Sequence, residues 1–134
     1  MPIDQLVPLL RVADVAHSMR WYREHLAMSA DPFPAEPPHV FCILRQGAVE
    51  LMLRRAEGAR PKPRAAYDWD VYLRRAGPGF RAVYEAFKAR GIVTRRLEQM
   101  PYGLAEFEIT DPDGHVICLA QVIDDAKDLP RPTR

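Results

Sequence analysis

EFEITDPDGHVICLAQV, residues 106–122, consists of two alternating runs that are joined by the tetrapeptide Asp111–Gly114. Pro112 fixes φ at the first central position of a turn, and Gly114 can take the left-handed conformation that follows it. A type I turn closed by a bulged glycine is a common connection in β-hairpins. The stretch therefore predicts two antiparallel strands.

The alternation places the side chains of this hairpin on two faces, because successive residues of a strand point to opposite sides. In the first run, Phe107 and Ile109 share one face, which is typical of core packing, and Glu106 and Glu108 share the other. In the second run, Cys118 alternates with aliphatic residues. Two acids on one face of a predicted hairpin are the first indication of a site.

The remaining chain predicts two helices. Asp14 is suited to N-cap the first, in which apolar residues recur at helical spacing up to Leu26. Gly77-Pro78 opens the second, with proline at its first position, and Gly91 ends it as a left-handed C-cap. Further strands are expected at residues 6–12, 40–44, 49–54, 67–74 and 92–97, with one irregular strand in the proline-rich loop after the first helix.

Each half of the chain therefore contains a strand, a helix and about three strands. Module one spans about residues 5–55 and module two about residues 67–123, and the polar, proline-bearing stretch 57–66 is the expected linker. We expect one α+β domain over residues 1–134 in which curved mixed sheets enclose a ligand cavity. The charged tail, 124–134, is expected to fray.

Composition excludes several classes of function. The chain has 134 residues, with 19 Lys and Arg against 18 Asp and Glu, and a nucleic-acid-binding protein normally has a basic excess. We see neither a signal peptide nor an apolar run long enough to span a membrane. Without an export signal the two cysteines are expected to be reduced thiols, and the cytoplasm is the expected compartment.

Three stretches occur in a characteristic order: PLLRVADVAHSMRWYREHLAM at 8–28, the helix exit KARG at 88–91, and YGLAEFEITDPDGHVICLAQ at 102–121. Together with the duplicated order of elements, they make the chain resemble the vicinal oxygen chelate (VOC) superfamily of glyoxalases, bleomycin-resistance proteins and extradiol dioxygenases. The resemblance extends over about residues 6–122. It implies two βαβββ modules of the glyoxalase fold.

Metal-dependent members of this superfamily resemble one another in having His and Glu ligands on the first and last strands of each module. Those positions hold Val7, Glu50, Asp70 and Cys118 here. Val7 cannot ligate a metal, and the other three mix hard oxygen with soft thiolate and lack an imidazole. We therefore expect no metal and no other cofactor. The open alternative is one divalent metal ion held by Glu50, Asp70 and Cys118.

The resemblance is closest to the bleomycin-resistance-like branch, whose members hold a ligand without a metal. It implies metal-independent binding and sequestration of a small molecule by a homodimer, as in antibiotic resistance. Acidic and aromatic side chains suit a cationic or aromatic ligand. The predicted ligand-binding residues are Arg11, Glu50, Asp70, Tyr72, Tyr102, Glu106, Glu108 and Cys118.

Two other functions stay open. One is a VOC enzyme, a lyase, isomerase or dioxygenase, that uses a divalent metal with Glu50 as ligand or base. No catalytic residue is assigned. The other is an interaction module whose cavity is filled by its own side chains.

Structural interpretations compete with these roles. Glu50 is suited to pair with Arg11, and Asp70 to accept a backbone hydrogen bond at a strand end. The hairpin acids are compatible with a solvent-facing sheet, and Cys118 with a small buried hydrophobe. Surface or structural roles are favoured for His17, His25, His39 and His115. The sequence identifies neither the ligand nor whether the modules pair within one chain or between chains.

Overall fold

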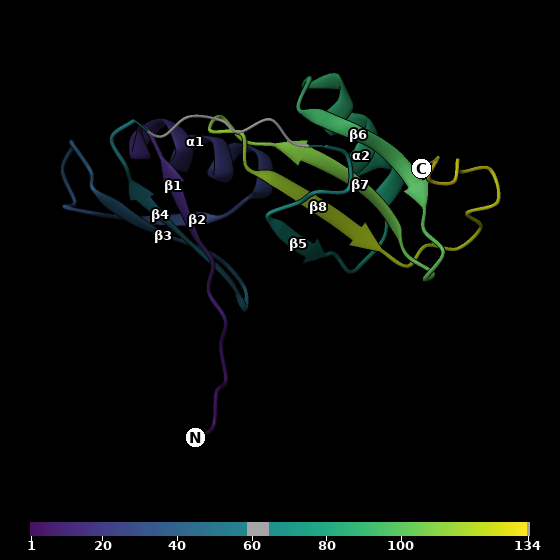
Figure 1. The fold of residues 1–134 in the computed structure, drawn as a ribbon, viewed down its shortest axis with the longest axis horizontal. Helices are drawn as coiled ribbons and strands as arrows, with labels where there is room; N and C mark the ends of the chain where they lie inside the picture. Colours follow the sequence, from purple (N-terminus) through teal and green to yellow (C-terminus); the bar gives the residue numbers. More distant parts are fainter. Residues whose placement is uncertain (59–64, 134) are drawn as a thin grey trace. The chain divides into compact units, whose positions relative to one another are not determined.

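The computed structural model describes residues 1–58 and 65–133. The chain divides into two compact units, Met1–Pro61 and Lys62–Arg134. Each unit contains one helix and one four-stranded mixed sheet (Figure 1). Part of the predicted linker, residues 59–64, lies outside the described residues, and the predicted module boundaries stay predictions.

The sheet of the first unit has the order β1-β4-β3-β2, with β1 parallel to β4 and the other pairs antiparallel. Helix α1 (Val15–Leu26) packs on one face of this sheet, and the apolar side chains between them form the core of the unit. The strands are β1 (Leu9–Val12), β2 (Ser29–Phe33), β3 (Phe41–Gln46) and β4 (Val49–Arg55).

The start of α1 confirms the predicted cap. The backbone N–H of His17 donates to the Asp14 carboxylate at 3.2 Å, which satisfies one of the donors that a helix start leaves without an intrahelical partner. Ala27 ends the helix in the left-handed conformation, with φ of 53°. Within the described part of the chain, neither helix has the length and hydrophobicity needed to cross a membrane.

The sheet of the second unit has the order β5-β8-β7-β6, with β5 parallel to β8 and the other pairs antiparallel. Its elements are β5 (Val71–Arg74), α2 (Phe80–Ala89), β6 (Val93–Gln99), β7 (Ala105–Thr110) and β8 (Val116–Gln121).

The core of this unit forms around Phe107, which is fully buried. Three rings of α2 contact it, with centroid distances of 5.4 Å for Phe80, 5.2 Å for Tyr84 and 6.0 Å for Phe87. The predicted core face of the hairpin is therefore confirmed. Because alternate side chains point to opposite faces, the acids of β7 point away from α2.

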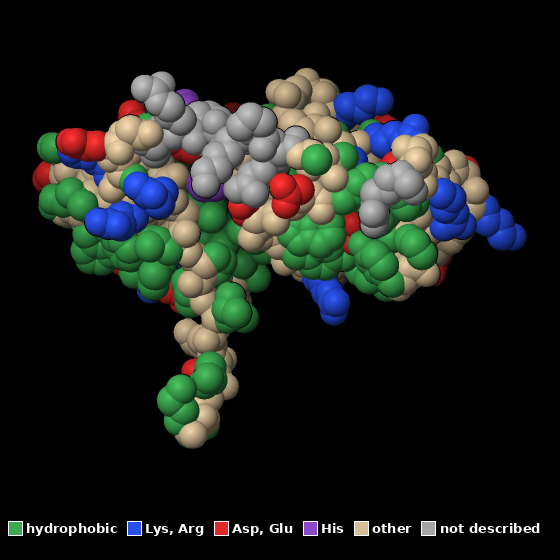
Figure 2. All heavy atoms as spheres, viewed as in Figure 1, with side chains coloured by type: hydrophobic (Ala, Val, Ile, Leu, Met, Phe, Trp, Pro, Cys, Tyr) green, Lys and Arg blue, Asp and Glu red, His purple; other side chains and the backbone are tan. Residues whose placement is uncertain are grey.

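The α+β fold class is confirmed, and so is the order of strand, helix and three strands in both units. The predicted first residues of three elements, β1, β5 and α2, were wrong. The first strand begins at Leu9 rather than residue 6, and the side chains of Met1, Ile3 and Leu6 are exposed. Figure 2 shows hydrophobic side chains along this extended N-terminal segment.

The other two starts lie in the second unit, and both have a backbone cause. Tyr67 has φ of 71°, so extended structure begins at Val71 rather than at residue 67. The left-handed Gly79 is the N-cap of α2, and Pro78 therefore precedes the helix instead of occupying its first position.

The tail was predicted to fray, and this was wrong for much of it. Arg81 of α2 donates two hydrogen bonds to the Asp128 carboxylate, at 2.7 and 3.0 Å. The carbonyl of Pro130 accepts from the backbone N–H of Gln99 on β6 at 3.0 Å. These contacts hold the C-terminal segment against α2 and β6.

The predicted turn of the opening hairpin is confirmed. The backbone N–H of Gly114 donates to the carbonyl of Asp111 at 3.0 Å, and Gly114 has φ of 84°. The Asp111 carboxylate also accepts from the backbone N–H of Asp113 at 2.9 Å and of His115 at 2.8 Å. Residues 111–114 therefore act as a turn.

We predict that Gly114→Val lowers the free energy of unfolding by about 1 kcal/mol or more, because a β-branched residue is strained at positive φ. Urea denaturation of the wild type and the variant measures this difference. Ala27→Gly is the control. It places glycine at a position that is already left-handed, so it should not lower the free energy of unfolding. An unchanged midpoint for Gly114→Val would contradict the prediction.

Candidate functional site

The face of the second sheet that lies opposite α2 is polar. Strand register places Glu108 beside Cys118, and Cys118 in turn beside Tyr72. Glu106 lies beside Ala120 on the same face. Although these groups point away from the aromatic core, Glu106 and Glu108 are 0% and 2% exposed, so other side chains cover them.

A buried guanidinium, that of Arg95 on β6, lies between three carboxylates. Its Nε donates to Glu108 at 2.7 Å, its Nη1 to Glu98 at 2.9 Å and its Nη2 to Glu106 at 3.1 Å. All four side chains are at most 4% exposed. We call these four residues the Arg95 cluster. Each of the three nitrogens of the guanidinium binds a different carboxylate, which fixes its orientation.

Irregular pairing of β6 brings Arg95 to this face. Strict alternation would place Arg95 on the same side as Val93, which lies opposite Ile109 of the core face. The register shifts between Val93 and Arg95, and again between Arg95 and Glu98. A β-bulge inserts an extra residue and so re-aims the side chains that follow it. Both members of the cluster from β6 reach the carboxylates of β7 in this way.

Three tyrosines donate hydrogen bonds to the cluster. Tyr67 donates its hydroxyl to Glu98 at 2.7 Å, and Tyr72 donates its hydroxyl to Glu106 at 2.6 Å. Tyr102 donates to the same oxygen of Glu106 as Tyr72 does. The ring of Tyr67 also lies 4.3 Å from the guanidinium carbon of Arg95, within the range of a cation–π contact.

Among the described residues, the acids of the cluster outnumber its cations. Besides Arg95, the described residues supply one more cation to it, Arg96, whose Nε lies 3.3 Å from Glu98 and whose side chain is 54% exposed. Three carboxylates thus meet two guanidinium groups. Glu106 has Arg95 as an ion-pair partner, which it shares with the other two acids, and otherwise neutral tyrosine donors.

Burial and ion pairing oppose each other in the pKa values of the cluster. Burial works against the charged form of Arg95, but the hydrogen bonds and attraction of Glu108 and Glu98 outweigh it and raise the guanidinium pKa. Burial also works against ionised Glu98, but hydrogen bonds from Tyr67, Arg95 and Arg96 outweigh it and lower the carboxyl pKa. Both groups are therefore charged near neutral pH.

The tyrosines and the thiol of this face are held neutral. Burial, followed by the hydrogen bond to Glu106, raises the pKa of Tyr72 and of Tyr102. Burial and the charge of Glu106 raise the pKa of the Cys118 thiol. Only the thiolate is a strong nucleophile or metal ligand, so Cys118 is unreactive here.

Five of the predicted binding residues lie together on this face: Tyr72, Tyr102, Glu106, Glu108 and Cys118. Their role in binding stays a prediction.

The other three predicted binding residues lie elsewhere. The Asp70 carboxylate accepts a hydrogen bond from the backbone N–H of Val116 at 2.9 Å, as in its structural interpretation. Glu50 and Arg11 belong to the first unit, where Glu50 lies 3.8 Å from Arg45 on the neighbouring strand. Arg11 lies on the edge strand β1, beside Arg54 of β4.

Sequence reasoning missed Arg95, Glu98 and Tyr67. The first two were hidden by the bulges, since an alternating pattern assigns faces only while the register is regular. Tyr67 was read as part of a strand, whereas its positive φ lets its backbone N–H donate to Glu108 at 3.1 Å. One signal was available: two adjacent acids on one face predict a buried or nearby cation.

The acids of this face do not fit a divalent metal ion. Among the described residues, no group of three His, Cys, Asp or Glu side chains is arranged to hold one. The guanidinium of Arg95 lies between the carboxylates and binds one oxygen of each, so these oxygens cannot converge on a single metal ion. Asp70 binds a backbone amide, and the Cys118 thiol is protonated.

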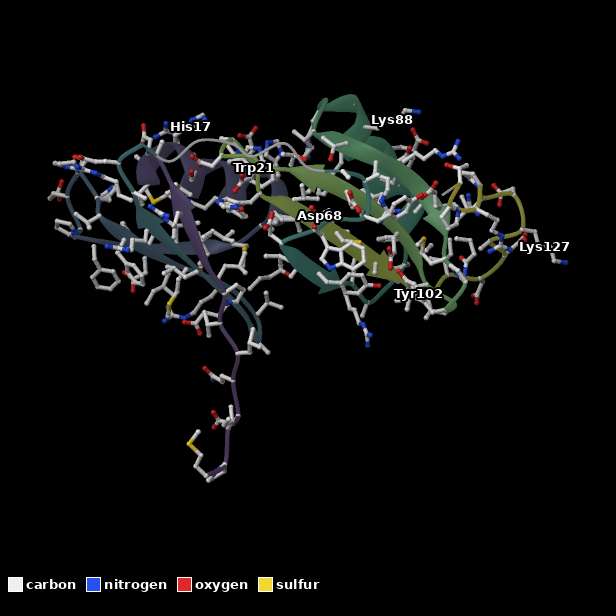
Figure 3. All side chains as sticks on the ribbon, viewed as in Figure 1. His17, Trp21, Asp68, Lys88, Tyr102 and Lys127 are labelled. Atoms are coloured by element: carbon white, nitrogen blue, oxygen red, sulfur yellow. The ribbon has the colours of Figure 1, made fainter. Side chains whose placement is uncertain are left out.

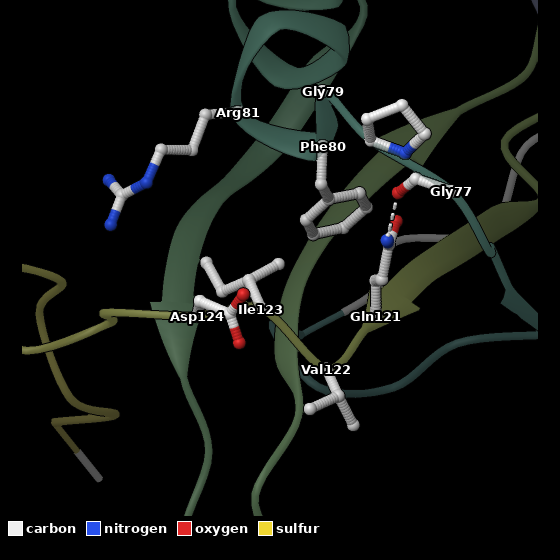
Figure 4. Close-up of a pocket in the computed structure, with 9 residues that line it drawn as sticks. Gly77, Gly79, Phe80, Arg81, Gln121, Val122, Ile123 and Asp124 are labelled. Carbon is white, nitrogen blue, oxygen red and sulfur yellow. Dashed lines mark hydrogen bonds between the residues drawn. The ribbon is translucent and has the colours of Figure 1, made fainter.

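A separate hollow of about 300 Å³ lies at the start of α2 (Figure 4). Two of its polar side chains, Gln121 and Arg81, are already engaged: Gln121 donates to the carbonyl of Gly77 and accepts from Arg75. Arg81 binds Asp128. We assign no ligand to this hollow.

We predict that Arg95→Met destabilises the fold by about 3 kcal/mol or more near neutral pH, because three buried carboxylates lose their shared cation. Urea unfolding measures this loss. Arg96→Met is the matched control, since its exposed ion pair should contribute about 1 kcal/mol or less. Equal losses in both variants would contradict a special role for Arg95.

We predict that Glu98 makes the protein less stable in acid. Its folded pKa lies below its ordinary value of 4.5, so its contribution to stability is present above that value and is lost as the pH falls through the folded pKa. Glu98→Gln should therefore show a shallower decline in unfolding free energy below about pH 4.5. Glu85→Gln, on the exposed side of α2, is the control. Identical acid profiles for the wild type and Glu98→Gln would refute the prediction.

Known structures resemble this chain over most of its length. A glyoxalase/bleomycin resistance protein/dioxygenase from Alicyclobacillus acidocaldarius has a TM-score of 0.70 and 16% identity and covers 91% of this chain and 93% of its own. Virulence protein STM3117 from Salmonella typhimurium has a TM-score of 0.64 and 24% identity and covers 92% of this chain and 100% of its own.

The fosfomycin resistance protein FosX from Listeria monocytogenes has a TM-score of 0.69 and 11% identity and covers 90% of this chain and 94% of its own. At these identities the likeness concerns the fold. No curated protein matches the chain in sequence. The family model of the glyoxalase/bleomycin resistance protein/dioxygenase superfamily, however, matches residues 3–119. With the paired βαβββ units, this match shows that the chain belongs to the glyoxalase/bleomycin resistance protein/dioxygenase superfamily.

Proposed function

We propose that this protein binds and sequesters a small organic cation with a planar part, without a metal, on the polar face of the second sheet. The observation that carries the proposal is the unequal charge of the Arg95 cluster, in which three buried carboxylates meet two guanidinium groups. The acids exceed these cations by one charge, and an excess of buried negative charge is costly, so a cationic ligand that reaches this face gains electrostatic energy.

Aromatic side chains beside the cluster support the planar part of the ligand. Tyr72 hydrogen-bonds Glu106, and its ring centroid lies 5.2 Å from that of Trp69 and 6.0 Å from the guanidinium carbon of Arg74. Flat rings beside an acid are the usual surroundings of a bound organic cation.

Family context agrees with a binding role. The superfamily includes bleomycin resistance proteins as well as enzymes, so membership is compatible with a binding role. The enzyme alternative requires a metal. The acids and the thiol of this sheet do not offer it suitable ligands, because Arg95 already occupies the carboxylates. We therefore prefer binding over metal-dependent lyase, isomerase or dioxygenase chemistry.

The test uses benzamidine, a planar cation, and benzamide, its neutral counterpart. Isothermal titration of the wild type should detect benzamidine and not benzamide. Glu106→Gln should weaken benzamidine binding by about tenfold or more, because it removes the charge that the ligand pairs with. Glu85→Gln should bind as the wild type does. Circular dichroism confirms that each variant is folded.

Elemental analysis after incubation with Ni, Zn, Mn or anaerobic Fe(II) tests the competing function. Substoichiometric metal in every case is expected. Stoichiometric metal that persists after desalting, or equal affinity for benzamide and benzamidine, would overturn the proposal.

A further inference from the structure

We propose that Tyr102 is a displaceable cover over Glu106, and that an N–H-bearing cation takes the place of its hydroxyl on the carboxylate. This inference rests on the proposed function and names the class of ligand and the residue that controls its entry. The starting observation is that Glu106 is 0% exposed. A ligand can therefore reach this carboxylate only after another side chain has moved away.

Two tyrosines share one oxygen of Glu106, and they are held very differently. Tyr72 lies on β5, which pairs with β8, and its ring centroid lies 5.2 Å from that of Trp69 and 6.0 Å from the guanidinium carbon of Arg74. Tyr102 lies in the loop between β6 and β7, and the residue is 55% exposed. Figure 3 labels Tyr102 beside this loop. Of the two donors, Tyr102 is the one that can leave.

The loop keeps its shape without the side chain of Tyr102. The backbone N–H of Met100 donates to the carbonyl of Leu104 at 2.8 Å, and that of Gly103 donates to the carbonyl of Met100 at 3.1 Å. Gly103 has φ of 94°, which completes the tight turn. A rotation of the Tyr102 side chain therefore uncovers Glu106 while the hairpin stays intact.

The exchange is favourable for one chemical class. A tyrosine hydroxyl is a neutral donor, and its raised pKa keeps it neutral. An ammonium, amidinium or guanidinium group also donates a hydrogen bond but brings a positive charge, and hydrogen bonds between two ionised groups are stronger than those with a neutral donor. A quaternary ammonium group carries the charge but has no N–H, so it cannot replace the hydroxyl.

The experiment compares Tyr102→Phe with Tyr84→Phe by isothermal titration with benzamidine. Both variants lose one hydroxyl, but Tyr84 lies on α2 against Phe107, on the opposite side of the sheet. Tyr102→Phe should bind benzamidine about tenfold more tightly than the wild type, because the ligand no longer has to break a hydrogen bond to a carboxylate. Tyr84→Phe should match the wild type.

Phenyltrimethylammonium, a planar cation without an N–H, is the second probe. Its affinity should be the same for the wild type and Tyr102→Phe. An equal gain for both probes would overturn the exchange of hydrogen bonds.

The two proposals fail in different ways. Unchanged or weaker benzamidine binding by folded Tyr102→Phe, with wild-type binding intact, would refute the cover and leave the proposed function standing. No binding of benzamidine by either protein would overturn both.

Discussion

The ion pairs between Arg95 and three glutamates decide what one face of the second sheet can do. Without the guanidinium, β6, β7 and their loop would bring three carboxylates together in a space that water does not reach. The cation makes this arrangement stable, and it also engages an oxygen of each acid that a divalent metal ion would need as a ligand. One residue therefore both permits the acidic face and restricts its chemistry.

The alternating side chains of strand β7 place an aromatic core residue on one face of the sheet and acids on the other. On the core face, Phe107 meets three rings of α2. Glu106 and Glu108 lie on the other face, where they contribute charge. Substitutions on the polar face therefore change its charge without removing a side chain of the aromatic core.

Much of the fold could be predicted from the sequence, because local signals and tertiary structure agree in this chain. The cap at Asp14, the turn at residues 111–114 and the core face of β7 follow from side-chain chemistry within a few residues. The centre of the candidate site could not be predicted in the same way. Arg95 and Glu98 reach it through bulges, and a bulge depends on pairing between strands rather than on the residues of one strand. The position of Tyr67 depends on a backbone angle that its sequence does not indicate.

The segment after β8 extends the folded unit beyond the part shared with the superfamily. The family model ends at residue 119, whereas Asp128 and Pro130 bind α2 and β6. β6 is the edge of its sheet, and an open edge can pair with a strand of another molecule. A chain shortened to the family boundary would lose the residues that lie along this edge. We expect such a shortened chain to associate more readily through this edge as its concentration rises.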